Sequence, residues 1–176
     1  MGDVFKEQIV KRKGTFKDIA IKACLCILAF LLGFAALLFI NPMLGVLVWF
    51  AAGFGARFLM SFLNVEYEYI FTSGELDIDI IYDQSRRKRV FSGHVKQFEI
   101  MAHIDDKNHE GAFNGAQEVR DYSGGVKGLD TYAFLTVHDG KKVKIIFDPN
   151  EKMLKAISGV LTRRNLHLRA GVILMP

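Results

Sequence analysis

Charge is missing from one long part of this sequence. Charged residues make up 24% of the chain, yet no Asp, Glu, Lys or Arg lies between Lys22 and Arg57. The one strongly polar interruption is Asn41-Pro42, a dipeptide typical of turns. Since the ~30 Å hydrocarbon core of a bilayer needs about 20 apolar residues per crossing, this pattern predicts two transmembrane helices joined by a tight turn.

Cysteine is scarce as well. The chain has two cysteines, Cys24 and Cys26, and both lie inside the apolar run. Two residues that are two positions apart on a helix point to different sides, so these thiols cannot easily pair with each other. The sequence therefore excludes a disulfide framework and a zinc site built on cysteine.

Catalytic and nucleotide-binding motifs are also missing. No serine lies in a nucleophile-elbow pattern, and no glycine-rich segment has the Walker spacing. One segment contains metal-ligand residue types, but their spacing fits no standard site and favours a solvated loop: His103, Asp105, Asp106, His109 and Glu110. We therefore expect no enzyme activity, no metal and no cofactor. The alternative is an enzyme in which the long loop 105–130 acts as a lid over the sheet.

The predicted membrane segment covers residues 23–63. Its helices are 23–40 and 43–63, with the turn at 41–42, and they reach about 27 and 31 Å. Lys22 and Arg57 are expected to be membrane-interface anchors, since long basic side chains near helix ends extend to the headgroups. Small residues such as Gly33, Gly45 and Gly53 allow close helix contact, either within the hairpin or between two chains.

A basic arm, residues 1–22, precedes the first helix. It holds six Lys and Arg residues, whereas the turn at 41–42 has none. Basic residues favour the cytoplasmic side, so we expect a multi-pass plasma-membrane protein with both termini in the cytoplasm. The arm itself is expected to form a short amphipathic helix on the headgroup surface or a leader without fixed structure.

The apolar run ends at residue 63, and residues 64–176 are predicted to form a soluble β-rich domain. Alternating segments predict a hairpin over 66–80, a strand over 86–91 and a strand over 95–101. The polar segment 105–130 is a long loop that could contain a short strand near 117–122.

The strongest hairpin signal is Asp139-Gly140, which separates strands 132–138 and 141–147. Ala133, Leu135 and Val137 are expected on one face, matched on the partner strand by Val143, Ile145 and Phe147.

An amphipathic helix should follow the hairpin. Asp148 is the expected N-cap, Pro149 suits the first helical position, and Glu151 completes a capping box. Arg163 and Arg164 are expected in its last turn, where cations suit the helix dipole. The apolar tail 166–176 could return as a short strand.

Several antiparallel strands closed by one helix form an α+β arrangement, a barrel or bent sheet, that resembles a pleckstrin-homology-like (PH-like) domain. The segments that carry the resemblance are EQIVKRKGTFKDI, VEYEYIFTSGELDIDIIYDQSRRKRV and KKVKIIFDPNEKMLKAI. With the helical hairpin, they resemble a family of bacterial membrane proteins with a cytoplasmic PH-like domain. The resemblance implies the fold and the membrane location of this chain. It provides no activity that could be assigned to the chain.

The densest basic cluster is Arg86, Arg87, Lys88 and Arg89. We expect the domain to bind a membrane or cytoplasmic protein, or a second copy of the chain, at the bilayer surface. The alternative is that this cluster binds anionic lipid headgroups, where each charge near the leaflet is worth about 1 kcal/mol. A further possibility is that the charges of this cluster only prevent the edge of a strand from pairing with another strand. Nucleic acid is not an expected partner, because no recognition motif accompanies the net charge of +4.

Overall fold

The computed structural model describes residues 4–125, 130–161 and 166–167. The chain divides into two compact units. The helical unit contains residues 13–65 and 82–86, and the sheet unit contains residues 1–12, 66–81 and 87–176.

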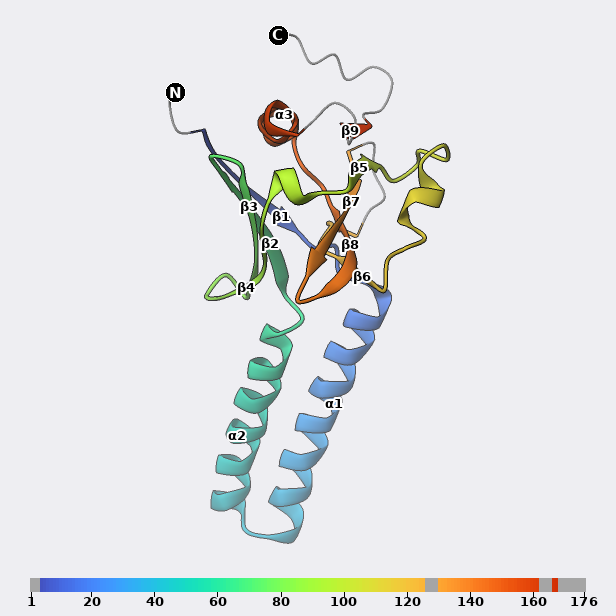
Figure 1. The fold of residues 1–176 in the computed structure, drawn as a ribbon. Coiled ribbons are helices and arrows are strands. Elements are labelled where there is room, and N and C mark those ends of the chain that lie inside the picture. The colour runs from blue at the N-terminus through green and yellow to red at the C-terminus, as the bar shows by residue number, and fades with distance from the viewer. Residues whose placement is uncertain (1–3, 126–129, 162–165, 168–176) are drawn as a thin grey trace. The chain divides into compact units, whose positions relative to one another are not determined.

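The helical unit consists mainly of α1 (Phe16–Phe39) and α2 (Pro42–Ser61), which lie side by side (Figure 1). The Asn41 side chain caps α2 by accepting a hydrogen bond from the Met43 backbone N–H at 2.9 Å, and Pro42 occupies the first helical position. These two helices fit the predicted hairpin. α1 begins before the uncharged run because the Asp18 carboxylate accepts from the Thr15 N–H at 2.8 Å.

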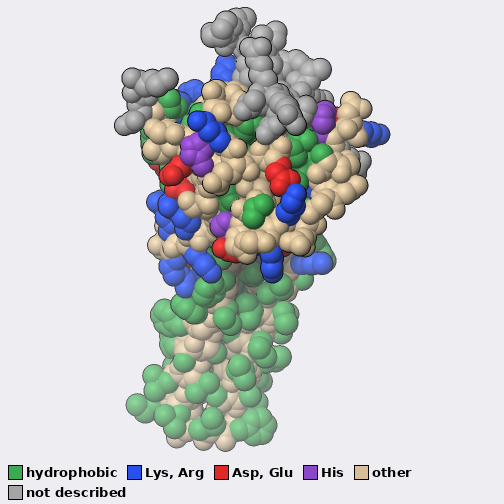
Figure 2. Space-filling view, viewed as in Figure 1, with side chains coloured by type: hydrophobic (Ala, Val, Ile, Leu, Met, Phe, Trp, Pro, Cys, Tyr) green, Lys and Arg blue, Asp and Glu red, His purple; other side chains and the backbone are tan. Residues whose placement is uncertain are grey.

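Both helices point most of their side chains outward. They are long and apolar enough to cross a membrane, and only 11% of the most apolar window of each is buried. Hydrophobic side chains therefore dominate the surface of this unit (Figure 2). A core helix of a soluble protein would instead be mostly buried.

The sheet unit contains two sheets. The first has the order β1-β2-β3-β4, formed by β1 (Phe5–Lys11), β2 (Val65–Thr72), β3 (Glu75–Tyr82) and β4 (Arg86–His94). The second has the order β6-β8-β7-β5-β9, formed by β5 (Ile100–His103), β6 (Glu118–Asp121), β7 (Tyr132–His138), β8 (Lys141–Phe147) and β9 (Leu166–His167). The pairs β6–β8 and β5–β9 are parallel, and β5–β7 and β7–β8 are antiparallel.

The N-terminal arm contains a strand, so the expectation of a surface helix or an unstructured leader is wrong for Phe5–Lys11. β1 pairs antiparallel with β2, from Phe5 opposite Thr72 to Lys11 opposite Glu66. The edge of β2 would otherwise leave backbone N–H and C=O groups unpaired, and β1 satisfies them. The Gln8 side chain adds a second attachment, since it donates to the Asp148 carbonyl at 2.8 Å and accepts from the Asn150 N–H at 2.7 Å.

The predicted strand over 95–101 is also wrong in its first half. Residues Val95–Gln97 form the 3-10 helix η1, and β5 begins only at Ile100. The His94 imidazole accepts from the Lys96 N–H at 3.2 Å and so supports a turn at this point. The short strand expected near 117–122 is confirmed as β6.

The β7–β8 hairpin is confirmed at its predicted residues. Asp139 and Gly140 have φ values of 51° and 75°, as a type I′ turn requires. The predicted matching of faces is wrong, because the register places Phe134, and not Ala133 or Leu135, opposite Ile145. Both faces of β7 are buried, which hides the alternation that the prediction used.

The core lies between the two sheets. Fully buried aromatic rings from both sheets meet there, and Phe98 stacks on Phe134 with ring centroids 4.0 Å apart. Helix α3 (Glu151–Val160) contributes Met153 and Ile157 and packs against β1 and η1 (Figure 1). Among the described residues the sheets do not close into a barrel, so the bent-sheet alternative describes the fold.

Asn150, and not Asp148, caps α3. The Asn150 side chain accepts from the Met153 N–H at 2.8 Å. Asp148 instead accepts from the Gly124 N–H and the Thr131 hydroxyl, both at 2.7 Å. The predicted positions of Arg163 and Arg164 and most of the apolar tail lie outside the described residues; Leu166–His167 forms β9.

Candidate functional site

Polar groups gather at one end of the helical unit, where the β3–β4 turn meets the helix ends. Lys22 donates to the side-chain oxygen Oδ1 of Asn64 at 2.8 Å, and the side-chain Nδ2 of Asn64 donates to Asp83 at 2.9 Å. Arg57 donates to the other Asp83 oxygen at 2.8 Å. The Asn64 amide and the Arg57 guanidinium hold the pKa of Asp83 below its usual value. The two predicted interface anchors thus belong to one hydrogen-bonded group.

Arg86 belongs to the same end of the helical unit. Its guanidinium lies 4.3 Å from the ring centroid of Phe62 and 5.1 Å from that of Phe58. It also donates to the Ser61 hydroxyl at 2.6 Å. The guanidinium is therefore engaged in cation–π contacts and a hydrogen bond.

The next basic residues pair with carboxylates inside the first sheet. Arg87 donates to Glu68 at 2.8 Å, and the Glu68 side chain is only 1% exposed. Arg89 bridges Asp79 at 3.0 Å and Asp77 at 2.9 Å. Burial raises the pKa of Glu68, while Arg87 opposes that rise.

Lys88 is exposed and forms no ion pair with any residue that the structure describes. The predicted basic cluster is thus divided among three environments. The structure does not bring its four charges together as one anion-binding surface.

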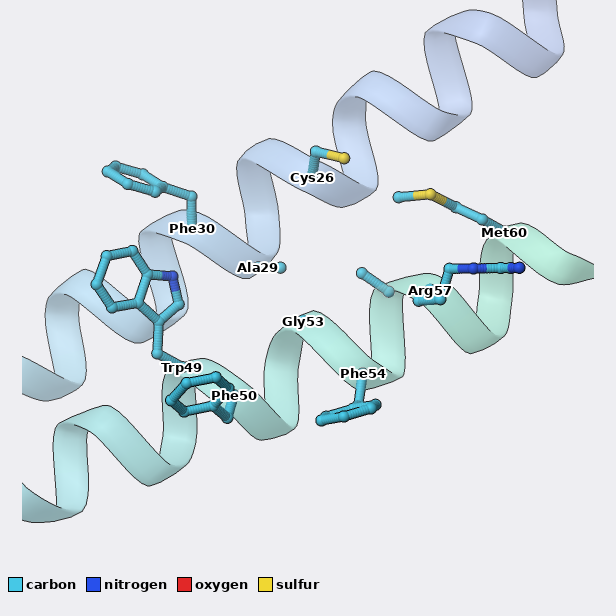
Figure 3. A pocket seen from close by; sticks show the side chains of 10 residues that line it. Cys26, Ala29, Phe30, Trp49, Phe50, Gly53, Phe54, Arg57 and Met60 are labelled. Carbon is cyan, nitrogen blue, oxygen red and sulfur yellow. The ribbon is translucent and has the colours of Figure 1, made fainter.

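A groove of about 750 Å³ runs along the two helices (Figure 3). Phe30 and Trp49 lie at one end, and Arg57 and Met60 lie at the other. Apart from Arg57 the lining is apolar, so the groove offers an apolar surface and no paired acid and base for catalysis.

The histidines of the loop are engaged separately. His109 lies 2.8 Å from Asp106, and His103 is buried with its ring against Tyr132. Within residues 4–125, 130–161 and 166–167, no group of three or more His, Cys, Asp or Glu side chains is placed to hold a metal ion.

The fold agrees with a comparison against protein families. A family model described as bacterial PH-like domain (DUF6106) matches residues 2–166. The chain belongs to this family. No curated protein and no solved structure matched in the corresponding comparisons. The resemblance to the PH-like fold is confirmed, and the match covers β1 and both helices as well as the two sheets of the PH-like protein.

Sequence reasoning missed the partners of the basic residues in this PH-like protein. The sequence places Asp83 in a turn and Phe62 in an apolar segment. Nothing in the sequence indicates that Asp83 pairs with Arg57 or that the Phe62 ring lies against Arg86. The alternation of Asp77 and Asp79 opposite a basic strand was the available signal, since opposite charges on neighbouring strands often pair.

Proposed function

We propose that this chain is an integral protein of the bacterial plasma membrane. In this proposal α1 and α2 cross the bilayer, and the PH-like sheets lie in the cytoplasm, where they bind another protein or a second copy of the chain. The observation that carries the proposal is the outward exposure of apolar side chains along both helices, which are only 11% buried in their most apolar windows. Exposed apolar surface of this extent is stable in lipid and not in water.

The pairing of β1 with β2 supports a cytoplasmic location for both ends. The chain leaves the sheet at Lys11 and re-enters it opposite, at Glu66. The intervening segment must therefore cross the membrane an even number of times. The basic residues before α1 favour the cytoplasm for that side.

The ion pairs of β4 favour a protein-binding role over recognition of lipid headgroups. To release Arg87 or Arg89 for a lipid phosphate, the protein would have to leave Glu68 or Asp79 buried without a cation. Uncompensated buried charge costs several kcal/mol, which exceeds the ~1 kcal/mol that one basic residue gains near an anionic leaflet. Lys88 remains available, but a single lysine makes a weak membrane contact.

Location and orientation can be tested by cysteine labelling of the full chain. Cys24 and Cys26 are replaced by alanine, and a single cysteine is introduced at Asn41 or at Lys88. A membrane-impermeant maleimide should label Asn41→Cys in intact spheroplasts and Lys88→Cys only after permeabilisation. Labelling of Lys88→Cys in intact spheroplasts, or recovery of the protein in the supernatant after alkaline carbonate treatment, would overturn the proposal.

The lipid alternative is tested in nanodiscs that hold the full chain. Acetylation of Lys88 should proceed at the same rate in zwitterionic discs and in discs enriched in phosphatidylglycerol. Strong protection by the anionic lipid would favour headgroup recognition.

A further inference from the structure

The outer face of the second sheet carries a small layer of its own. Phe113 packs there against Ala133 and Leu135 as part of a buried apolar cluster, to which Ala116 adds a partly buried contact. Beside this cluster lies a cavity of about 300 Å³. Its floor is a polar and apolar mixture, unlike the core between the sheets.

The strand register builds the floor of the cavity. Ala133 of β7 and Asp121 of β6 both lie opposite Ile146 of β8. Lys144 is two positions from Ile146 and therefore projects from the same face. The small side chain of Ala133 also lines the cavity, next to Ile146 on the side of β8 away from Asp121.

Two opposite charges line this cavity without pairing. The Lys144 ammonium lies 4.6 Å from the centroid of the Phe113 ring and forms no ion pair with a described residue. The Asp121 carboxylate accepts from the Ser123 N–H at 2.9 Å, and no cation among the described residues pairs with it. Lys144 and Asp121 are two register positions apart on the parallel β8 and β6 strands, so both side chains line the cavity from the same face of the sheet.

The other polar side chains of the cavity are held in place by the protein. The Thr131 hydroxyl donates to Asp148, Asp106 is paired with His109, and His103 accepts from the Asp105 N–H at 3.2 Å. The wall is therefore fixed, and the charges left to recognise a ligand are those of Lys144 and Asp121.

We propose that this cavity binds a small zwitterion, a molecule with one carboxylate and one ammonium group, such as an α-amino acid with a small side chain. The carboxylate lies at Lys144 and the ammonium at Asp121. A simple anion or a simple cation would satisfy only one of the two residues. The volume is at the lower end of the range for small-molecule pockets and suits a ligand of this size.

The test uses the full chain in detergent and isothermal titration calorimetry with glycine, L-alanine and L-serine. At least one of these should bind saturably, while acetate and methylammonium, which each carry one of the two charges, should bind at least about tenfold more weakly. Lys144→Met keeps the stem against Phe113, and Asp121→Asn keeps an acceptor for the Ser123 N–H; each should weaken binding at least about tenfold.

Lys142→Met is the matched control, since Lys142 is on the same strand but does not line the cavity and instead pairs with Glu99 at 2.9 Å. This variant should bind as the parent does. The proposal fails if none of the three amino acids binds at 10 mM, if acetate binds as well as glycine, or if both cavity variants bind unchanged. None of these outcomes depends on where the protein is located, so they leave the membrane proposal to its own test.

Discussion

Glu68 is a buried carboxylate that forms an ion pair with Arg87. Its side chain is 1% exposed, one of its oxygens has no hydrogen-bond partner, and Arg87 pairs with the other. Burial raises its pKa, so the folded state binds this proton more tightly than the unfolded chain does. The stabilising effect of that proton is complete below the unfolded pKa of 4.5 and is lost as the pH rises through the folded pKa.

We therefore predict that Arg87→Met lowers the free energy of unfolding by about 2 kcal/mol at pH 7, since it leaves Glu68 charged and buried. The deficit should shrink as the pH falls toward 4.5, because Glu68 then takes up a proton. Urea unfolding of the full chain in detergent, followed by far-UV circular dichroism, measures both effects. Lys88→Met on the same strand is the control and should change stability by less than about 0.5 kcal/mol. An equal deficit at both pH values would show that Glu68 is not its cause.

Asn150 supplies the N-cap of α3 that the sequence pattern assigned to Asp148. We expect Asn150→Ala to cost about 1 kcal/mol of stability, because the Met153 N–H loses its acceptor. The same urea measurement applies, with Asn114→Ala as a control at an exposed position that makes only a backbone contact. If the two variants were equally stable, the cap would contribute nothing.

At the scale of elements, the glycines of α2 differ in whether the neighbouring helix leaves room for a Cβ atom. A Cβ on Gly45 would lie 2.7 Å from the Leu37 Cα and 2.8 Å from its backbone nitrogen, whereas a Cβ on Gly53 would meet nothing within 4 Å. Gly45 therefore permits close contact of α1 with α2, and Gly53 faces the open groove (Figure 3).

Gly45→Ala should force the helices apart and cost about 1–3 kcal/mol, as overpacking does in other tight contacts. Gly53→Ala is the matched control and should be neutral or slightly stabilising, because alanine favours helix. Unfolding of the full chain by sodium dodecyl sulfate, monitored by circular dichroism, compares the two. A larger loss for Gly53→Ala would place the critical contact in the groove instead.

The elements that the sequence predicted well are those with local signals. The charge-free run, the Asn41-Pro42 turn and the Asp139-Gly140 hairpin depend on residues close in the chain. β1 was not predicted because its partner β2 follows only after both helices. The residues of β1 alone do not indicate this long-range pairing. The contacts of Arg86 in the candidate site escaped prediction for the same reason, since a turn and the end of a helix bring them together. The cavity of the second sheet escaped it too, because Lys144 and Asp121 come together only through strand order.

At the scale of the whole molecule, the sheet unit is discontinuous in sequence. A fragment that begins at Asn64 lacks β1, and the edge of β2 would be exposed together with the loop that Gln8 holds. We predict that this fragment aggregates, because an unpaired edge strand recruits other chains. A chain in which residues 4–12 are joined to residue 64 by a flexible linker should remain monomeric in size-exclusion chromatography. Equal behaviour of the two chains would contradict a structural role for β1.

The position of β1 also has a consequence for biosynthesis. The ribosome releases this strand first, but its neighbour in the sheet appears only after both apolar helices have been synthesised. In the membrane topology that we propose, the strand remains without its partner until the second helix has returned the nascent polypeptide to the same compartment. In that topology, failure of one helix to insert would leave the strand and its neighbour in different compartments, so completion of the sheet would report correct insertion of both helices.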